Sequence, residues 1–192
     1  YNLASLKDRY FNEKEAKEAL NYLNKAIDIN PQYGQAYGLR ASVKNTLDDL
    51  SGAIDDYDKV IDINPLSWTD YYFRGNLKER IGDNQGAIKD FSLGLQVLKS
   101  LGNPIPQQQG EYLKSRGRVY KKIGSHELAT NDFTEALKFS YKDDFRFIFS
   151  DRGDSKKEIG DLKGACEDWL KAESISIFMV PSLNENTWCN RQ

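Results

Sequence analysis

The sequence has 192 residues, of which 39% are hydrophobic and 29% are charged, and its formal net charge at pH 7 is −2. This composition is typical of a soluble globular protein and lacks the basic excess that nucleic-acid binding favours. No apolar run is long enough to cross a bilayer. The two cysteines and one histidine lack the spacing of a zinc site, so we expect no metal and no cofactor.

The chain begins at Tyr1 rather than at methionine. We therefore expect a fragment, a processed form or a trimmed piece of a longer protein, in which any signal sequence has been lost from view. The cellular compartment is for this reason unknown from the sequence.

Residues 1–33 are predicted to form a helical pair whose second helix is the clearer one. Apolar residues from Ala19 to Ile27 recur at helical spacing, and the run ends at Asn30-Pro31. The first helix fits less well, because Lys7 falls where the later units have a small residue. Terminal units of repeat proteins are often atypical, so this unit is either a cap or the cut end of a longer array.

Residues 34–67 and 68–101 are two copies of one pattern of 34 residues. A fixed period of this length is the signature of a stacked-repeat protein, in which no unit can bury its apolar face alone. Function is then expected on a surface. The matching positions are Arg40 and Arg74, Ala53 and Ala87, and Asp56-Tyr57 and Asp90-Phe91.

Each copy is predicted to be a helical hairpin, because its apolar residues recur every three to four positions along two segments. The break between the segments is an apolar residue, usually a glycine, and then Asp or Ser. Glycine can adopt the left-handed conformation after a helix, and Asp or Ser can cap the next one. The breaks are Leu47-Asp48-Asp49, Ile81-Gly82-Asp83, Ile123-Gly124-Ser125 and Ile159-Gly160-Asp161.

An insertion, residues 102–109, shifts the register by eight residues after the third unit. Its two prolines, Pro104 and Pro106, exclude a regular helix through this segment. The segment could be a domain linker. We favour an enlarged surface loop within one continuous stack, because the pattern resumes at once in units 110–143 and 146–179.

Four units share a small residue, Ala41, Gly75, Gly117 or Gly153, twelve positions before an alanine. An aromatic residue follows four positions after that alanine. Glycine inside a helix costs roughly 1 kcal/mol relative to alanine, so we infer that the column marks a close helix crossing, with the aromatic residue beside it. Enlarging Gly75 or Gly117 should destabilise the fold, whereas changes at Gly102 or Gly110, in or next to the insertion, should cost less.

A second column pairs an arginine with an aspartate sixteen residues later, on the opposite helix of the same hairpin. We interpret it as a repeated structural ion pair. The alternative is a ladder of arginines offered to an acidic ligand. The pairs are Arg40 and Asp56, Arg74 and Asp90, Arg116 and Asp132, and Arg152 and Asp168.

The end of the chain departs from the pattern. After Ala172 it is dense in apolar residues as far as Val180, and residues 180–192 form a tail. An apolar run of this kind is unfavourable in water. We expect it to extend the last helix over the exposed end of the stack; a homodimer contact, or binding in the protein's own groove, are the alternatives.

No constellation of reactive residues predicts catalysis. His126 with Cys166 or Cys189 could suggest a base and a nucleophile, but no third orienting group is identifiable. Pairs such as Asp48-Asp49 are expected to be solvated caps and faces. The Gly-Asp turns lack the spacing of a phosphate-binding loop. We therefore predict that the protein is not an enzyme.

These residues resemble the tetratricopeptide repeat family, whose unit of 34 residues has a small residue in the first helix and an alanine and an aromatic in the second. Its closing proline is matched by Pro31 and Pro65, although Lys99 and Tyr141 stand there in later units. The resemblance implies an all-α, right-handed α-solenoid of about five hairpins. It implies a single array over residues 1–179.

The resemblance also implies a site. In this family the first helices line a concave groove that holds a peptide or helix of a partner, so we expect a non-catalytic protein-interaction scaffold. The cations of the fourth unit favour an acidic partner. Carried over by register, the groove residues are Tyr72, Asn76, Glu79, Arg80, Lys114, Arg118, Lys121, Lys122, Asp154 and Lys157.

Two alternative functions remain open. Some family members clamp the terminal carboxylate of chaperones, and Asn76, Lys114 and Arg118 supply suitable residue types. Tyr72 and Asp151 depart from that pattern, since the clamp has lysine at the first position and arginine or asparagine at the second. A helical-repeat RNA binder would need a basic groove, which the acidic balance of the chain argues against.

Overall fold

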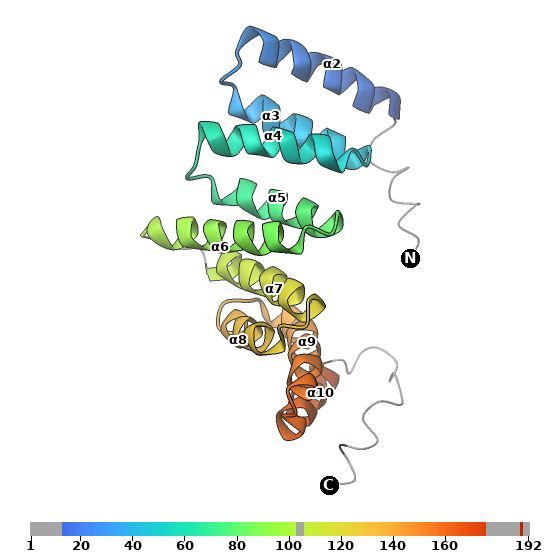
Figure 1. Cartoon of the computed structure of the whole chain (residues 1–192), viewed down its shortest axis with the longest axis vertical. Coiled ribbons are helices and arrows are strands. Elements are labelled where there is room, and N and C mark those ends of the chain that lie inside the picture. Colours follow the sequence, from blue (N-terminus) through green and yellow to red (C-terminus); the bar gives the residue numbers. More distant parts are fainter. Residues whose placement is uncertain (1–12, 103–105, 176–188, 190–192) are drawn as a thin grey trace. The chain divides into compact units, whose positions relative to one another are not determined.

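The computed structural model describes residues 13–102, 106–175 and 189, and all regular secondary structure in these residues is helical (Figure 1). The chain divides into two compact units, Tyr1–Val97 and Leu98–Gln192, which are described separately. The described part of the chain contains no helix with the length and hydropathy of a membrane span. The prediction of an all-α helical repeat fold is confirmed.

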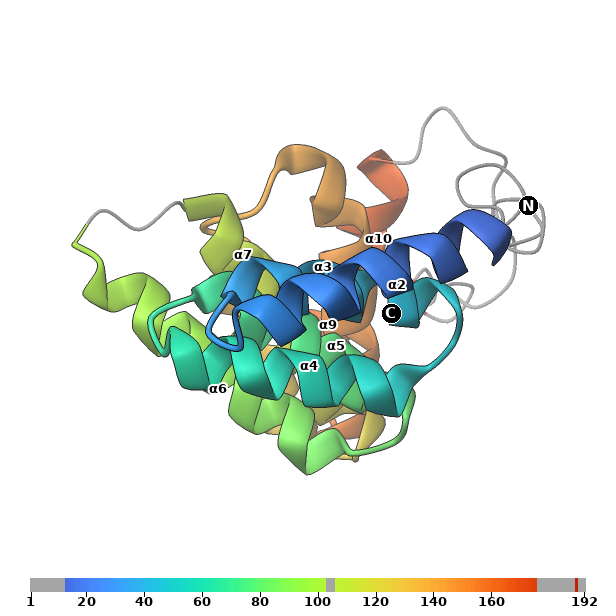
Figure 2. The ribbon, with the colours of Figure 1, turned by 90° about the horizontal axis from the view of Figure 1, so that it is seen from above.

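The first unit contains antiparallel helix pairs. Helix α2 (Glu13–Ile29) is the second helix of the first hairpin, and the first helix predicted there lies outside the described residues. Helices α3 (Gly34–Thr46) and α4 (Leu50–Ile63) form the next hairpin, with α2 beside them in Figure 2. Helices α5 (Trp68–Arg80) and α6 (Asn84–Ser100) form the third, and α6 runs past the boundary of the unit.

The second unit has two hairpins. Helices α7 (Pro106–Lys122) and α8 (His126–Ala136) form one of them. A short 3₁₀ turn, η1 (Lys142–Asp144), leads to the other, α9 (Phe145–Glu158) and α10 (Leu162–Ile175).

Helix α7 begins earlier than the sequence suggested. Its first residue is Pro106, so residues 106–109 of the expected loop are helical. Proline is well accommodated at the first helical position, where its missing N–H would have no intrahelical partner. Residues 103–105 of the insertion lie outside the described part of the chain.

The turns inside the hairpins agree with the predicted stop and start signals. Gly82, Gly124 and Gly160 have φ of +87°, +79° and +82°, and Asp48 takes the same role at +64°. The following aspartate then caps the next helix: the side chain of Asp161 accepts a hydrogen bond of 2.9 Å from the backbone N–H of Gly164. Asp49 and Asp83 cap α4 and α6 in the same way. Ser125 precedes α8 at the equivalent position but makes no such bond.

This difference predicts unequal costs for two matched substitutions in the second unit. Asp161→Ala removes a cap and should lower the free energy of unfolding by about 1 kcal/mol. Ser125→Ala removes a side chain that makes no capping bond and should change it by less than about 0.5 kcal/mol. Urea denaturation followed by circular dichroism measures both values. Equal losses would mean that the cap of α10 adds nothing.

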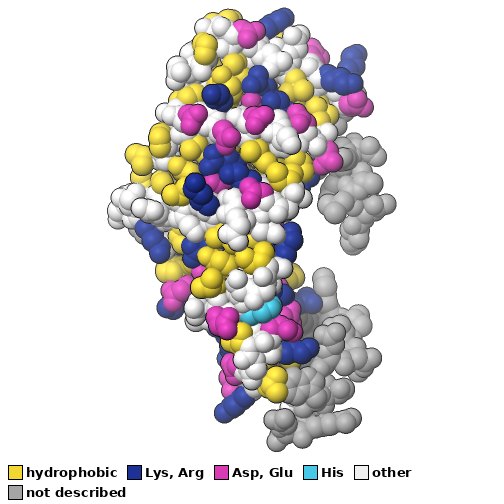
Figure 3. All heavy atoms as spheres, in the orientation of Figure 1, with side chains coloured by type: hydrophobic (Ala, Val, Ile, Leu, Met, Phe, Trp, Pro, Cys, Tyr) yellow, Lys and Arg dark blue, Asp and Glu magenta, His cyan; other side chains and the backbone are white. Residues whose placement is uncertain are grey.

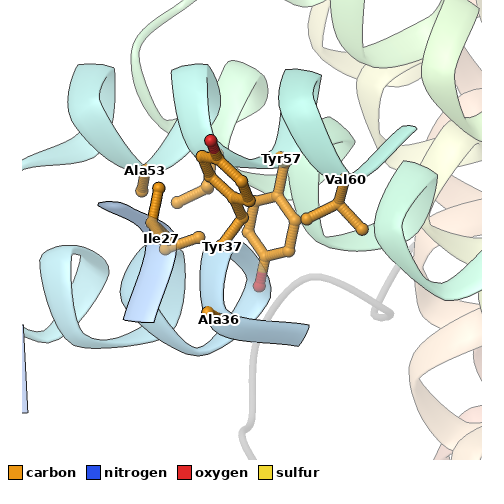
Figure 4. Packing of buried hydrophobic residues seen from close by; sticks show 8 residues of the cluster. Ile27, Ala36, Tyr37, Ala53, Tyr57 and Val60 are labelled. Carbon is orange, nitrogen blue, oxygen red and sulfur yellow. The ribbon is translucent and has the colours of Figure 1, made fainter. Parts of the chain in front are cut away.

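One hydrophobic cluster of the first unit lies between α2, α3 and α4. Tyr37 and Tyr57 are buried between α3 and α4, together with Ala53 and Val60, and Ile27 reaches them from α2 (Figure 4). Burial and the nearby charge of Asp70 raise the pKa of the Tyr57 hydroxyl to about 12, so it is neutral at physiological pH.

The small residues Gly75 and Gly117 are tightly enclosed, as predicted. Their nearest neighbour is an aromatic ring rather than the backbone of the second helix. A Cβ added at Gly75 would lie 2.8 Å from a ring carbon of Phe91, and one at Gly117 would lie 2.9 Å from Phe133. Both rings are fully buried. The glycine therefore makes room for the face of an aromatic side chain from the second helix of the same hairpin.

One expectation about the glycines is wrong. Gly110 is not a permissive position next to a loop, because it is buried inside α7. A Cβ there would lie 3.0 Å from the backbone N of Ser140 and 3.1 Å from the backbone carbon of Phe139. Gly102 has open space around it, but its φ is +71°. A substitution there meets no steric clash and is unfavourable only because other residues rarely adopt this backbone conformation.

Candidate protein-interaction surface

In the first unit, the predicted groove residues lie on α5. The ring of Tyr72 packs against Phe91, with the ring centroids 5.9 Å apart, and against Phe73 at 6.1 Å. The amide of Asn76 donates a 2.7 Å hydrogen bond to the backbone carbonyl of Tyr72. Glu79 is half-buried. These side chains are largely engaged within their own hairpin.

Arg80 connects two successive first helices. Its guanidinium donates to the side chain of Asn45, at the end of α3, and forms a 3.0 Å ion pair with Asp48. The Arg80 side chain is 48% exposed, so this contact is at the surface. On the face of the first unit seen in Figure 3, basic and acidic side chains lie next to one another.

In the second unit, the structure places Lys114 in the interior rather than on an exposed face. The residue is 7% exposed, and its ammonium group lies 2.6 Å from Glu111 and 3.2 Å from Asp144. Glu111 is on the same helix, whereas Asp144 belongs to η1. Lys114 therefore ties α7 to the start of the next hairpin, and its charge is compensated.

Four other charged residues form a cluster between α7 and α9, here called the α7–α9 ion-pair cluster: Arg118, Lys121, Asp151 and Asp154. Arg118 donates from Nε to Asp151 over 3.0 Å. The ammonium of Lys121 bridges both aspartates, at 2.9 Å from Asp151 and 2.6 Å from Asp154. Two cations face two carboxylates, so the cluster is balanced in charge.

Lys121 remains charged at neutral pH. Partial burial of Lys121 opposes its charge, but the hydrogen bonds that its ammonium group donates to Asp151 and Asp154 outweigh this effect, and the pKa of Lys121 is raised above its ordinary value. The sequence analysis had treated Asp151 only as a departure from a clamp motif. The structure makes it the carboxylate that both cations share.

A side chain of helix α10 also binds the cluster. Trp169 donates a 3.1 Å hydrogen bond from its indole N–H to Asp154, and its ring lies against Gly153. Two other hairpins have Phe91 and Phe133 at this position, and phenylalanine has no donor, while the α3–α4 hairpin has Tyr57 there. The change from Phe to Trp was the sequence signal for this contact, and the sequence analysis missed it.

Two further predicted groove residues lie near the C-terminal ends of their helices. Lys122 on α7 and Lys157 on α9 are both exposed. Lysine is favoured there by the helix dipole, which supplies a purely structural reason for their presence. Their exposure also makes them accessible to a partner.

The arginine–aspartate column is confirmed as structural. Arg74 donates to both carboxylate oxygens of Asp90, at 2.8 and 2.6 Å, and Arg116 binds Asp132 in the same way at 2.8 Å twice. Burial opposes the charge of Arg74, but the hydrogen bonds that it donates to Asp90 and Asp58, and the attraction of their negative charges, raise its pKa above the ordinary value. The alternative of a ligand-binding arginine ladder is therefore not adopted.

The pairs of Arg40, Arg74 and Arg152 have additional partners that were not predicted from the sequence. A lysine one turn after the arginine binds the same aspartate: Lys44 with Asp56, Lys78 with Asp90, and Lys156 with Asp168. The arginines also reach the second helix of the preceding hairpin through Asn24, Asp58 and Thr134. The column thus fastens neighbouring hairpins together within each unit.

The residues considered for catalysis do not assemble into a site. Cys166 and Cys189 are joined to each other in a disulfide, so neither is a free thiol. The Nδ1 atom of His126 is buried without a hydrogen-bond partner. Among the described residues, no group of three His, Cys, Asp or Glu side chains could hold a metal ion.

Residues 8–33 and 34–65 match the family model of the tetratricopeptide repeat. These two segments are tetratricopeptide repeats. The sequence resemblance is confirmed, and the second segment coincides with the α3–α4 hairpin.

Solved structures show the same repeat fold at low sequence identity. MamA 41-end from Desulfovibrio magneticus RS-1 has a TM-score of 0.73 at 16% identity, covering 93% of this chain and 95% of that one. BtubC (BKLC) from P. vanneervenii has a TM-score of 0.75 at 15% identity, covering 95% and 82%. The APC/C hetero-tetramer Cut9–Hcn1 has a TM-score of 0.59 at 18% identity, covering 85% and 31%.

The sequence comparison with curated proteins found no significant match. The tetratricopeptide repeats and the structural neighbours together support a protein-interaction scaffold. At these identities the structural likeness describes the fold, and function depends on the surface of this chain.

Proposed function

We propose that this chain is a non-catalytic scaffold that holds a peptide or helix of a partner protein against the first helices of its hairpins. The α7–α9 ion-pair cluster carries the proposal. Its side chains come from two successive first helices and meet at 2.6–3.0 Å, so residues predicted for one groove do share a face in the second unit. Binding by such a face is the usual mode of helical repeat proteins.

The charge of the partner is a finer proposal. The cluster is neutral as a set, and Lys114 is compensated in the interior, so neither attracts an acidic peptide strongly. Lys122 and Lys157 are exposed at the ends of α7 and α9. We infer that a partner carboxylate would bind these lysines first, with the cluster supplying both donors and acceptors for the partner's backbone and polar side chains.

The carboxylate-clamp alternative receives no support from the geometry. The three residues that suggested it already have partners: Asn76 binds the backbone of its own helix, Lys114 binds Glu111 and Asp144, and Arg118 binds Asp151. Recruiting them would require breaking these contacts.

A matched pair of charge reversals tests the proposal. Lys157 and Lys163 are both exposed and belong to the same hairpin, but Lys157 is on the first helix and Lys163 on the second. Lys157→Glu should weaken partner binding about tenfold, and Lys163→Glu should leave it unchanged. Partners captured by the wild-type chain are identified by cross-linking and mass spectrometry, and their affinities for the three proteins are then compared.

Salt provides a second measurement on the same partner. Attraction by exposed lysines is screened over about 10 Å at ~0.1 M salt, so affinity should fall as salt rises. Equal affinities of both variants, together with indifference to salt, would show that the first-helix face of the second unit is only a solvated surface.

A further inference from the structure

Cys166 lies on α10 and is half-buried, and its sulfur is bonded to that of Cys189. The two Cα atoms are 5.6 Å apart, which is the usual separation for a disulfide. The sequence has two cysteines, and the disulfide uses both of them. The sequence analysis considered them only as zinc ligands or nucleophiles.

We propose that Cys166–Cys189 is a permanent structural disulfide and that this chain matures in an oxidising compartment. Disulfides persist in secreted proteins, the bacterial periplasm and the endoplasmic reticulum lumen, and are rare where thiol reductants are abundant. Pairing of the only two cysteines, 23 residues apart in sequence, is the arrangement of a structural cross-link.

The bond requires a defined oxidant. The two thiols lose two protons and two electrons when the S–S bond forms, and a disulfide-bearing thiol oxidoreductase accepts them by exchange and leaves as a dithiol. An oxidising compartment supplies such a protein, and a reducing one works against the product. The proposal thus predicts where the chain is oxidised as well as which atoms are joined.

The position of the disulfide on α10 bears on the stability of the last hairpin. Cys166 is next to Ala165, which is fully buried, and two residues before Asp168, whose carboxylate binds Arg152 and Lys156. The cross-link therefore attaches residue 189 to the helix that holds the last hairpin together. By restricting the unfolded chain, it should stabilise the second unit in particular.

The oxidation state is tested on the full chain from its native cells. Thiols are blocked with N-ethylmaleimide during lysis in acid, and the digested protein is examined by mass spectrometry without reduction. We expect a linked pair of peptides containing Cys166 and Cys189, with no alkylation of either. Alkylation of both cysteines in most molecules would overturn the proposal.

The structural role is tested by thermal unfolding of the purified oxidised chain with and without dithiothreitol. Reduction should lower the melting temperature by about 5 to 15 °C. The double variant Cys166→Ser, Cys189→Ser should melt at the reduced temperature and show no response to dithiothreitol. An oxidised chain whose melting temperature does not change on reduction would contradict a stabilising role, and this measurement on the wild type does not depend on the folding of the variant.

Discussion

Replacing Asp168 by alanine is expected to lower the free energy of unfolding by about 3–5 kcal/mol. The carboxylate is fully buried and binds Arg152 through both oxygens, at 2.7 and 2.6 Å, and Lys156 at 2.9 Å. Its loss removes the carboxylate that both cations bind, and both cations have low exposure. Removing one partner of a buried ion pair is costly for this reason, even where the intact pair adds little net stability.

The control for this prediction is an exposed pair in the same unit. Glu135 binds Lys138 on the surface, with side chains 49% and 59% exposed. Glu135→Ala should change the free energy of unfolding by less than about 1 kcal/mol, because exposed pairs are well screened by water. Urea denaturation followed by circular dichroism compares the two variants. A loss at Asp168 no larger than that at Glu135 would mean that the arginine–aspartate column does not hold the hairpins together.

Replacing Gly75 by leucine is expected to destabilise the first unit by about 3 kcal/mol or more. The position is buried, and even the first added carbon would lie 2.8 Å from the ring of Phe91. That ring is itself fully enclosed, so it cannot move aside without opening the α5–α6 hairpin. Overpacking a rigid core in this way forces the backbone or the side chains out of their preferred geometry.

A matched glycine in the preceding hairpin gives the opposite expectation. A Cβ at Gly38 on α3 would lie 3.9 Å from Val60, which is an ordinary contact. Gly38→Ala should therefore be neutral or stabilise the unit by up to about 1 kcal/mol, because alanine favours a helix over glycine. Gly75→Ala should instead be destabilising. If both alanine variants were equally stable, the ring contact at Gly75 would be too soft to explain the glycine.

The residues predicted to bind a partner are placed only in part by the repeat register. Arg118, Lys121 and Asp154 fall on neighbouring first helices by register, and the structure brings these three together with Asp151. The burial of Lys114 does not follow from the register, because its partner Asp144 lies 30 residues later, in the irregular turn that precedes α9. Whether these residues bind a protein stays a prediction.

The sequence alone determined the hairpins, the turns and the arginine–aspartate pairs. These features recur at fixed short spacing in several units of the chain. They can therefore be recognised even where one unit is irregular. The tertiary structure alone decided the compensation of the groove cations by Asp151 and Asp154, the bond from Trp169 to Asp154, and the disulfide between Cys166 and Cys189. These contacts join residues that are distant in the chain or on different helices, and they do not follow the 34-residue period. Such contacts depend on how the helices pack in three dimensions, and no periodic pattern in the sequence announces them.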